Sequence, residues 1–580
     1  MAKMPQTNRT GASIGPDVAS LTGAESHSAR TNRVRPGIPR PEENELLNAK
    51  CHPITVVPGL SRLYLEYCFG AAAMRGFYAP GSWNDGWQQR PEAPAHWVEL
   101  VRLLGGQNSS AAATAALEVL RGGGGVVVTG QQVGLFGGPL FTPFKVATAL
   151  ARAREATSAG RPHAAIFWLA TEDHDFAEIN HVVFPARREL RTLVYSATPE
   201  STRPVGGVVL DDSITPLMEQ ARELLGDSDA TEALAAAYKP GRTLAQAFAE
   251  FYSQAFASQG LLVLDASGRE AHRMGAPVLR AVLEQADDLH QALSERNREL
   301  ETAGYHAQVA VGPQSSLLFL IDERTGARVA LKRLPPSAQE PKGLWQAGRQ
   351  SFSKADLVGI LDTEPERISP SALLRPVFQD FLLSSSAIVG GPAEIAYFAQ
   401  SAVLYERILG RGTPVLPRFS ATLIEPKIGE LLNKHELTLE RVFGETPASL
   451  AQLLAARTMP EAGRQRLVAA GAALETELAA LLEWMHTLDA GLGRSADTSA
   501  SKMRYQMSRL RRLAANFQLQ REEALTRQAE AVCQAISPGG ALQERVHGAA
   551  YYFARYGFGL AEEMTAQAAK CCNGHAEMWL

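Results

Sequence analysis

The sequence lacks the segments that carry proteins into or across membranes. None of its apolar runs approaches the roughly 20 residues that a helix needs to span a bilayer, and its first residues contain no compact apolar core like that of a signal peptide. Cysteine is scarce as well: the chain has 5 in 580 residues, without CxxC spacing or the density of a disulfide-stabilised domain. We therefore expect a cytoplasmic protein that makes no contact with a membrane.

An excess of charge of one sign is also missing. The formal net charge is -4 at pH 7, which gives no broad basic field of the kind that neutralises nucleic-acid phosphates. We expect small-molecule substrates and no nucleic-acid partner. What the chain does have is length and apolar content: with 580 residues, of which 45% are hydrophobic and 20% charged, it can bury a large core and form more than one structural unit.

The segment from Val126 to His181 contains two polar motifs, each directly after a short apolar run. The first is VVVTGQQVGLFGGPLFTPFK and the second is AAIFWLATEDHDFAEINH. The strand VVVTG, the helix FKVATALARAREA and the strand AAIFWLA predict a β-α-β unit, the repeating element of a parallel sheet covered by helices. The fold class that we expect is α/β, with a Rossmann-like parallel-sheet core.

The rest of the chain is predicted to surround this core in blocks. Residues 1–48 carry no hydrophobic period and are expected to be a disordered extension. The core covers residues 49–420, with inserted connecting segments near 187–240 and 285–370. The second insertion contains an expected β-hairpin, SLLFLIDERTGARVALKR, with a Thr-Gly turn. Residues 541–580 form a C-terminal segment with a tail, KCCNGHAEMWL, that we expect to be disordered.

Residues 421–540 have the pattern of a helical coiled-coil arm. Between Leu467 and Leu492, leucines follow the 3-4 alternation of a heptad, and the segment from Met503 to Phe517 repeats it after a polar break, GLGRSADTSASK. These segments predict two long helices that fold back as an antiparallel α-helical coiled coil. A projecting apolar arm favours a homodimer. The alternative is a helix pair packed flat on the globular core.

The glycine-rich turn after the first strand, from Thr129 to Gly138, is the first candidate binding site. Its glycines let a ligand approach the backbone closely, and unpaired backbone N–H groups at a helix start suit an anion. Lys145 lies one or two helical turns further on and is placed to meet a phosphate. Neither the P-loop pattern GxxxxGK[ST] nor GxGxxG is present, and the alternative is a turn whose glycines serve packing alone.

Ionisable residues gather after the second strand, in Glu172-Asp173-His174-Asp175. The carboxyl ends of parallel strands are where ligands bind in open α/β sheets. The flanking carboxylates are expected to stabilise the imidazolium of His174, which could then donate a proton or positive charge, while Asp173 or Asp175 holds the ring. A helix N-terminus capped by Asp175 is the alternative. A third interpretation, metal binding by His174, Asp175 and His181, lacks a further motif with matching ligand spacing.

Polar residues in otherwise apolar surroundings complete the candidate site. Arg375 stands in the apolar helix SALLRPVFQDFLL, where a guanidinium needs either a substrate anion or an internal acid as its partner. Gly391, in the run GGPAEIAYF, marks another loop-to-helix turn of the sheet, with Glu394 behind it. Tyr305 stands beside a histidine in a further polar cluster.

At these residues the sequence resembles a known family. TGQQVGLFGGPLFTPFK, FWLATEDHDFAEINHV, LRPVFQDFLL, VGGPAEIAYF, FSATLIEPK, LQERV and ARYGFGL together are similar to the bacillithiol biosynthesis cysteine-adding enzymes, the BshC family of cysteine ligases. The resemblance runs from about Cys51 to Leu560, and the TGQQ and EDHD motifs are long and specific. The chain departs from the family in its first fifty residues and in the tail that contains Cys571 and Cys572.

The resemblance implies a ligase that joins the carboxylate of L-cysteine to the amine of glucosaminyl-malate, the last step of bacillithiol synthesis. It also implies a Rossmann-type core and a coiled coil that supports dimers. ATP with Mg²⁺ is implied by analogy with class I aminoacyl-tRNA synthetases, although their HIGH and KMSKS signatures are absent here. The alternatives are a metal-dependent hydrolase and a nucleotide-binding scaffold protein.

The resemblance also implies roles for the site residues. His174 and Lys145 would stabilise charge that develops on phosphate, and Asp173 and Asp175 would complete the catalytic group. Arg375 would hold a carboxylate of malate or cysteine. No resident metal ion is expected. The other substrate- or nucleotide-binding residues are expected to be Thr129, Gly130, Gln131, Gln132, Gly134, Gly138, Glu172, Asn180, Tyr305, Gly391 and Glu394.

Overall fold

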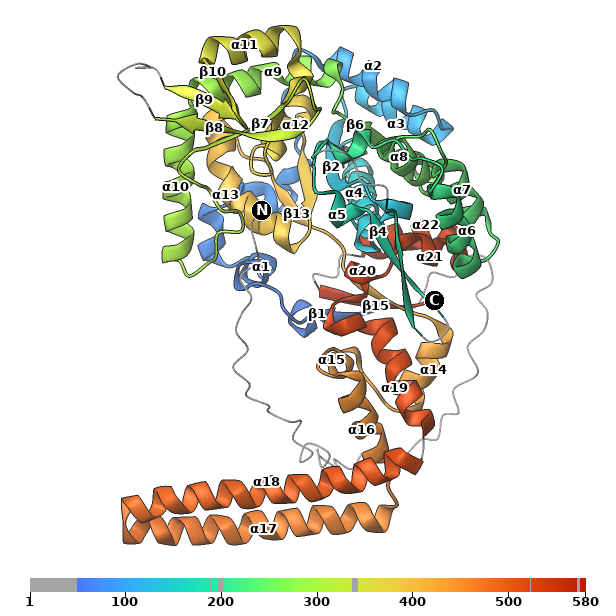
Figure 1. Ribbon diagram of the computed structural model, residues 1–580, viewed down its shortest axis with the longest axis vertical. Helices are drawn as coiled ribbons and strands as arrows, with labels where there is room; N and C mark the ends of the chain where they lie inside the picture. The colour runs from blue at the N-terminus through green and yellow to red at the C-terminus, as the bar shows by residue number, and fades with distance from the viewer. Residues whose placement is uncertain (1–48, 187–188, 197–201, 336–342, 522, 571–573) are drawn as a thin grey trace. The chain divides into compact units, whose positions relative to one another are not determined.

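The computed structural model describes residues 49–186, 189–196, 202–335, 343–521, 523–570 and 574–580 (Figure 1). The predicted disordered extension, residues 1–48, lies outside the described residues, and so do Cys571 and Cys572. The described chain divides into two compact units. One contains residues up to Pro426 together with Ala541–Leu580, and the other contains Lys427–Gly540. Within the described ranges no helix is both long enough and apolar enough to cross a membrane.

The core of the first unit is a five-stranded sheet in the order β13-β12-β2-β3-β6, with every neighbouring pair parallel. This confirms the predicted α/β fold with a Rossmann-like parallel sheet. Both predicted strands of the β-α-β unit form, and they pair along their whole length. The strands are β2 (Gly125–Gln132), β3 (His163–Ala170), β6 (Leu262–Asp265), β12 (Ala387–Gly390) and β13 (Val415–Pro417).

The order of these strands reverses at β2. From β2 the chain adds β3 and β6 on one side of the sheet, and it later adds β12 and β13 on the other side. Such a topological switch point leaves a crevice at the carboxyl ends of the two central strands, because their following segments turn away in opposite directions. The TGQQ motif forms the end of β2 rather than the predicted turn, the EDHD motif follows β3, and GGPAE begins at the last residue of β12, so all three lie at this edge of the sheet.

One face of the sheet is covered by α4 (Phe141–Ser158) and α8 (Leu244–Ala255). Alternate strand residues point to this face, because successive side chains of a strand alternate between its two sides. Phe167 of β3 packs against Phe248 and Tyr252 of α8, with ring centroids 6.0 and 5.1 Å apart. The fully apolar strands therefore match a sheet that is buried on both sides.

The other face meets α12 (Arg375–Leu383) and, beyond it, α9 (Arg269–Glu284). Trp168 of β3 points to this face and contacts the ring of Phe378 on α12, with centroids 6.4 Å apart. Gly275 of α9 lies directly against Phe378, so a β-carbon at this position would overlap the ring. Close approach of the two helices therefore depends on the missing side chain.

The insertion near residues 285–370 forms a second, antiparallel sheet in the order β10-β9-β8-β7-β11. The predicted hairpin is confirmed, since β7 pairs with β8. Its turn contains Thr325 and Gly326, and Gly326 adopts a φ of +70°, which glycine tolerates best. The strands are β7 (Ser315–Ile321), β8 (Arg328–Leu334), β9 (Leu344–Ala347), β10 (Gln350–Phe352) and β11 (Ile368–Pro370).

A third sheet contains β1 (Ala49–Pro53), β15 (Gly574–Trp579) and β14 (Ala421–Ile424). The central strand, β15, pairs antiparallel with β1 and parallel with β14. The predicted disordered tail is therefore wrong for Gly574–Trp579. The terminal position suggested disorder, but the polar side chains of β15 are buried and bonded within the fold, and His575 is fully buried.

The remaining elements of this unit surround the sheets. A two-stranded hairpin, β4 (His181–Pro185) and β5 (Leu190–Val194), follows the EDHD motif. The helices are α1 (Arg62–Cys68), α2 (Trp97–Gln107), α3 (Ala111–Arg121), α5 (Phe176–Ile179), α6 (Ile214–Leu225), α7 (Asp229–Ala237), α10 (Ala286–Thr302), α11 (Lys354–Thr363), α13 (Pro392–Leu409), α20 (Gln543–Val546), α21 (Ala549–Tyr556) and α22 (Gly559–Ala569).

The second unit is helical, and its two longest helices form the predicted antiparallel coiled coil. Arg504 pairs with Glu475 at 2.9 Å and His486 pairs with Asp497 at 3.1 Å, so the numbers of facing residues run in opposite directions. The predicted polar break is wrong, because GLGRSADTSASK is helical and the two helices are separated by Asp489 alone. The helices are α14 (Pro426–Lys434), α15 (Leu439–Phe443), α16 (Pro447–Arg457), α17 (Glu461–Leu488), α18 (Ala490–Arg521) and α19 (Glu523–Ile536).

The carboxylate of Asp489 explains how so polar a segment starts a helix. Its Oδ1 accepts hydrogen bonds from the backbone N–H groups of Gly491 and Leu492, at 2.7 and 2.9 Å. An acidic side chain at this position satisfies N–H groups that have no partner within the helix. A single residue therefore suffices to reverse the chain.

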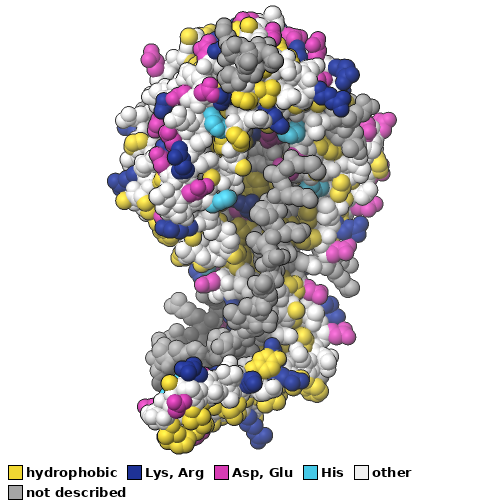
Figure 2. All heavy atoms as spheres, turned by 60° about the vertical axis from the view of Figure 1, so that its left-hand side comes forward, with side chains coloured by type: hydrophobic (Ala, Val, Ile, Leu, Met, Phe, Trp, Pro, Cys, Tyr) yellow, Lys and Arg dark blue, Asp and Glu magenta, His cyan; other side chains and the backbone are white. Residues whose placement is uncertain are grey.

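The hairpin exposes many large apolar side chains (Figure 2). Leu478 is buried between the helices, whereas Trp484 and Leu488 are 55% and 56% exposed. On α18, Leu510 and Phe517 are 56% and 62% exposed. Two helices have thus buried only part of the apolar stripe that the heptad pattern encodes. We call the exposed side chains Leu481, Trp484, Leu488, Leu492, Met503, Leu510, Leu513 and Phe517 the hairpin stripe.

The contact between α9 and α12 yields a prediction. Gly275→Ala should destabilise the protein by about 1 to 3 kcal/mol, because the new methyl group overfills a packed core at Phe378. Gly359→Ala is the matched control, since Gly359 is an exposed helical glycine of α11 with no atom near its would-be β-carbon. That change should be neutral or stabilise by up to ~1 kcal/mol. Urea unfolding of the two variants measures both effects, and equal stabilities would contradict the packing.

Candidate functional site

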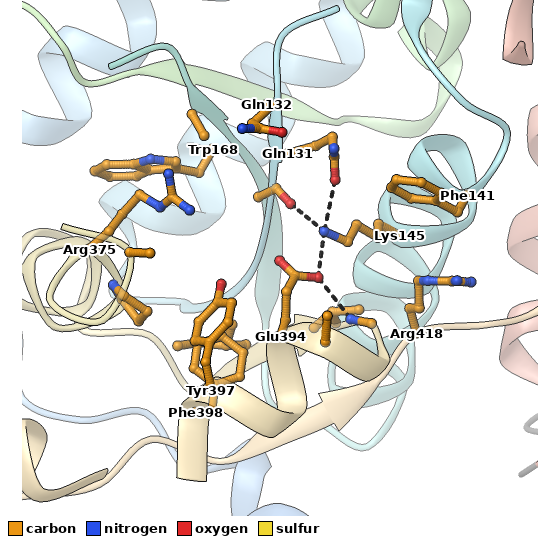
Figure 3. A pocket seen from close by; sticks show the side chains of 18 of the residues that line it. Gln131, Gln132, Phe141, Lys145, Trp168, Arg375, Glu394, Tyr397, Phe398 and Arg418 are labelled. Atoms are coloured by element: carbon orange, nitrogen blue, oxygen red, sulfur yellow. Dashed lines mark hydrogen bonds and ion pairs between the residues drawn. The ribbon is translucent and has the colours of Figure 1, made fainter. Parts of the chain in front are cut away.

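A cavity of about 450 Å³ opens at the switch point of the parallel sheet (Figure 3). Its wall is formed by the ends of β2 and β3, the start of α13 and one side of α12. Segments far apart in the sequence meet here, as the strand order requires. Eight of the predicted site residues line the cavity: Gly130, Gln131, Gln132, Lys145, Asp173, Arg375, Gly391 and Glu394.

Lys145 is buried, and all three of its N–H groups are engaged. Nζ lies 2.7 Å from the backbone oxygen of Gly130, 3.0 Å from Oε1 of Gln131 and 2.5 Å from Oε2 of Glu394 (Figure 3). The same Glu394 oxygen accepts a hydrogen bond from the N–H of Gly391 at 2.8 Å. An ammonium group has three donors, so a phosphate could contact Lys145 only by replacing one of these partners. Lys145 ties the TGQQ turn to the start of α13.

Asp173 stands at the centre of a second cluster. Its Oδ2 accepts hydrogen bonds from Nη1 of Arg375 at 3.1 Å and from Nε2 of Gln132 at 2.9 Å, and Nη1 of Arg328 lies 3.7 Å from its Oδ1. Burial alone would raise the pKa of this carboxyl group, but the guanidinium groups of Arg375 and Arg328 outweigh burial and lower it. Asp173 therefore stays ionised at neutral pH. Gln132 also donates to Glu178, at 3.2 Å.

Arg328 brings the second sheet to the EDHD motif. It begins β8, is buried, and stacks on Phe319 of β7 with its guanidinium carbon 3.8 Å from the ring centroid. Its Nε donates to Oγ of Ser369 at 3.0 Å, and its Nη2 donates to the backbone oxygen of Pro370 at 2.7 Å. The remaining Nη1 faces Asp173. Arg328 was not among the predicted site residues, because its partner lies 155 positions earlier in the chain.

His174 does not line the cavity, and its expected protonation is wrong. Its Nδ1 lies 3.3 Å from Nη1 of Arg328, a donor, and its ring lies 5.7 Å from that of Phe319. Burial and then the Arg328 charge lower the pKa of His174, and together they outweigh the neighbouring Asp173 and Asp175. The imidazole is therefore neutral at pH 7. Burial, together with the charge of Arg328 from another sheet, thus lowers a pKa that the two adjacent carboxylates were expected to raise.

The other acids of the EDHD motif have different surroundings. Oε1 of Glu172 lies 2.9 Å from Nε2 of His272, which is fully buried on α9. Burial lowers the pKa of His272, but Glu172 outweighs burial and raises it. Asp175 precedes α5 without making a side-chain cap hydrogen bond, so the pure capping interpretation is wrong.

The second half of the glycine-rich turn serves packing. The hydroxyl of Tyr238 donates to the oxygen of Gly134 at 2.6 Å and accepts from the N–H of Gly137 at 3.0 Å. The N–H of Gly138 donates to the oxygen of Leu135 at 3.0 Å. Gly134 and Gly138 therefore do not reach the cavity, and the predicted unpaired N–H groups are already used there.

Three further predicted residues hold the structure rather than line the cavity. Thr129 is buried and donates from Oγ1 to the oxygen of Val389 at 3.0 Å, which joins β2 to β12. Asn180 donates to the oxygen of Tyr195 at 3.2 Å, beside the β4–β5 hairpin. Tyr305 donates its hydroxyl to the carboxylate of Glu66 on α1, away from the cavity. The structure thus separates these residues from the site.

Two arginines on the cavity wall were not among the predicted site residues. Arg418 is buried and forms a two-pronged ion pair with Glu544 of α20, and its Nη1 also donates to the oxygen of Phe419 at 2.8 Å. Arg545, the residue after Glu544, lines the same cavity. The sequence signals were charged residues inside the runs RFSATLIEPK and LQERV. Trp168 and Tyr397 add an aromatic part of the wall (Figure 3).

A buried polar network lies behind Arg418. Oγ of Ser420 lies 3.0 Å from Oε2 of Glu544 and 2.8 Å from Nδ1 of His575, and Oγ1 of Thr422 lies 2.7 Å from Nε2 of the same histidine. The strand β15 therefore supports, through Ser420 and Glu544, an arginine of the cavity. Burial is the largest cause that lowers the pKa of His575, to about 4, so its ring is neutral at pH 7.

The metal-binding interpretation finds no supporting geometry in the described part of the chain. There, no group of three or more His, Cys, Asp and Glu side chains is arranged to hold a metal ion. His181 begins β4 and is exposed, as is Asp175.

Comparison with known proteins gives matches to both units. Residues 49–419 match the family model described as "Bacillithiol biosynthesis BshC, N-terminal Rossmann-like domain", and residues 421–576 match "Bacillithiol biosynthesis BshC, C-terminal coiled-coil domain". A relative from Koribacter versatilis is 39% identical over 90% of this chain and 98% of its own length. Relatives from Solibacter usitatus and Salinibacter ruber are 36% and 31% identical over 78% and 87% of this chain, and over 84% and 93% of their own lengths. All three are named "Putative cysteine ligase BshC".

The buried histidine predicts how stability depends on pH. The pKa of His575 is about 4 in the folded protein and 6.5 in an unfolded chain, so below pH 6.5 the unfolded state binds the proton first. Stability should therefore fall as the pH drops from 6.5 toward 4, by roughly 2 kcal/mol between pH 7 and pH 5 from this group. Urea unfolding at the two pH values should show a smaller loss of unfolding free energy in His575→Gln than in the unaltered protein.

His306→Gln, at an exposed histidine, is the control and should keep the loss seen in the unaltered protein. An identical loss in His575→Gln and in the unaltered protein would contradict the buried neutral state.

Proposed function

The chain belongs to the BshC family of bacillithiol biosynthesis, and on this basis we propose that it is a cysteine ligase. The proposed reaction, in the cytoplasm, joins the carboxyl group of L-cysteine to the amino group of glucosaminyl-malate in an amide bond, with the overall loss of one water molecule. The observation that carries the proposal is the cavity at the switch point, whose wall holds charged groups of both signs. Such a wall suits a substrate that bears an ammonium group and carboxylates.

Glu178 and Gln132 are the proposed binding residues for the amine. Glu178 lines the cavity beside Gln132 and forms no ion pair with a Lys or Arg among the described residues. Amide formation requires a neutral amine, which loses a proton as the bond to the acyl carbon forms. A carboxylate within hydrogen-bond reach can take that proton. Asp173 orients Gln132 and stays an acceptor, because its two arginines keep its pKa low.

Two predicted roles change with the geometry. His174 is proposed as a positioning residue, since it contacts Arg328, which in turn lies against Asp173. Arg375 is proposed to fix Asp173 at the cavity wall. An internal acid, one of the two partners that the sequence left open, pairs with Arg375 in the described structure.

ATP and Mg²⁺ do not fit the donors and ligands that the sequence suggested for them. The N–H group of Gly137 is bonded to the hydroxyl of Tyr238, that of Gly138 to the oxygen of Leu135, and that of Gly391 to Glu394. The three donors of Lys145 are likewise used. Asp173 is held between two guanidinium groups, which disfavours a divalent cation at the same carboxylate. We therefore derive no step from either group.

The hairpin stripe supports a homodimer as the form in which the ligase works. A pair of helices exposes this stripe, whereas two hairpins packed together would bury it in a four-helix bundle. A second copy of the chain carries the same stripe, and self-complementary patches of this kind build twofold dimers. The proposed partner at the coiled coil is therefore another copy, and the proposed ligands of the cavity are L-cysteine and glucosaminyl-malate.

A substitution in the EDHD motif tests the site. Asp173→Asn should lower bacillithiol about 100-fold, with glucosaminyl-malate accumulating, when it replaces the unaltered protein in a deletion strain, because Gln132 and Arg375 lose the anion that orders them. Asp175→Asn is the matched control and should support normal thiol levels, since Asp175 is exposed. Thiol profiling measures both, and thermal unfolding of purified Asp173→Asn verifies the fold. Normal bacillithiol in a folded Asp173→Asn strain would remove Asp173 from the site.

A second substitution tests the dimer. Leu513→Glu combined with Phe517→Glu should convert the protein to a monomer at micromolar concentration, because buried carboxylates without partners are strongly unfavourable in an apolar interface. Arg512→Glu, on another flank of α18, changes the charge without touching the stripe and should leave the dimer intact. Light scattering gives the mass of each variant. A monomeric unaltered protein would refute the dimer.

A further inference from the structure

Arg545, on the cavity wall, carries a charge that has no partner among the residues that the structure describes. Arg545 lines the cavity, yet its side chain forms no hydrogen bond or ion pair with any described residue. The residue before it, Glu544, is committed to Arg418, and the one before that, Gln543, clamps the backbone of Leu423 through bonds of 2.8 and 2.9 Å. The short helix α20 is therefore anchored by two consecutive side chains. This leaves the third, Arg545, at the cavity.

The other cations of the cavity wall are all neutralised. Lys145 pairs with Glu394 at 2.5 Å, Arg375 pairs with Asp173 at 3.1 Å, and Arg418 pairs with Glu544. Arg545 is exposed and adds a further positive charge close to that of Arg418. Of these two neighbouring guanidinium groups only Arg418 has a carboxylate partner, which favours binding of an additional anion.

Two charged side chains at the cavity form no ion pair among the described residues. Glu178 is an exposed carboxylate that accepts a hydrogen bond from Gln132 at 3.2 Å. Arg545 is an exposed guanidinium near Arg418. A ligand that pairs with both side chains carries an ammonium group and an anionic group.

We infer that Arg545 binds the malyl carboxylates of glucosaminyl-malate. This inference rests on the proposed function for the identity of the ligand. The glucosamine amine then lies at Glu178 and Gln132, and the malyl group lies at Arg545. Arg545 thus makes the site specific for the sugar joined to a dicarboxylate, because a glucosamine without malate leaves the guanidinium unpaired. Arg418, which is paired with Glu544 and bonded to the oxygen of Phe419, lies on the same cavity wall.

Calorimetry on the full-length protein tests the inference with two sugars. Arg545→Ala should weaken binding of glucosaminyl-malate about 10- to 100-fold, the usual size of a lost charge-assisted hydrogen bond. It should leave binding of methyl glucosaminide, which has no carboxylate, unchanged. The affinity of Arg545→Lys for glucosaminyl-malate should lie between those of Arg545→Ala and the unaltered protein. An ammonium group keeps the charge but lacks the planar pair of donors. Arg191→Ala, at an exposed arginine that pairs with Glu189 at 3.1 Å, is the control and should bind both sugars normally.

Other outcomes overturn the inference in distinguishable ways. Equal affinity of Arg545→Ala and the unaltered protein for glucosaminyl-malate would show that Arg545 does not hold the malyl group. Weakened binding of ATP or inorganic phosphate, with glucosaminyl-malate unaffected, would assign the guanidinium to a phosphate instead. If the unaltered protein bound no glucosaminyl-malate and formed no amide product, the proposed function itself would fail, and the inference with it. In steady-state kinetics the expected effect is a raised KM for glucosaminyl-malate at nearly unchanged kcat.

Discussion

The site depends on the need to neutralise one carboxylate, that of Asp173. An ionised group that is removed from water must be paired and hydrogen-bonded, or its charge becomes very unfavourable. Asp173 meets this requirement with Arg375 from α12, Arg328 from β8 and Gln132 from β2. Each partner comes from a different part of the first unit. The parallel sheet, the inserted antiparallel sheet and the helix between β11 and β12 are thus held together at the cavity by a single anion.

The local parts of this arrangement could be predicted from the sequence. The strands β2 and β3 and the helix α4 have hydrophobic patterns that neighbouring residues determine, and the strand–turn–helix order of a parallel sheet places their polar ends at one edge. Eight of the predicted residues line the cavity for this reason. The coiled coil could also be predicted, because the heptad pattern depends only on residues that are close together in the sequence. Its polar connection was misjudged, because the pattern did not show that Asp489 alone could start the second helix.

The remaining parts depend on contacts between distant segments. Burial and the charge of Arg328 lower the pKa of His174, and the residues near His174 in the sequence predict neither of them. The glycines at the end of the TGQQ turn receive their partners from Tyr238 and Tyr252, which are more than a hundred positions away. Arg545 is the clearest case. Its side chain remains without a partner among the described residues because Gln543 and Glu544 bond to other segments. These long-range bonds cannot be predicted from a single sequence.

The strand β15 has a consequence for how the protein is made. Ser420 and His575, which meet across this sheet, are separated by 155 positions, and the coiled-coil unit is inserted between them. A ribosome therefore releases the parallel sheet, including β13, well before it supplies the strand that supports Ser420, Glu544 and Arg418. Domains fold largely in the order of their synthesis, and a nascent chain can hold a finished core beside an unfinished edge. The support of the ligand cavity would then be completed only after β15 has been synthesised, long after the parallel sheet.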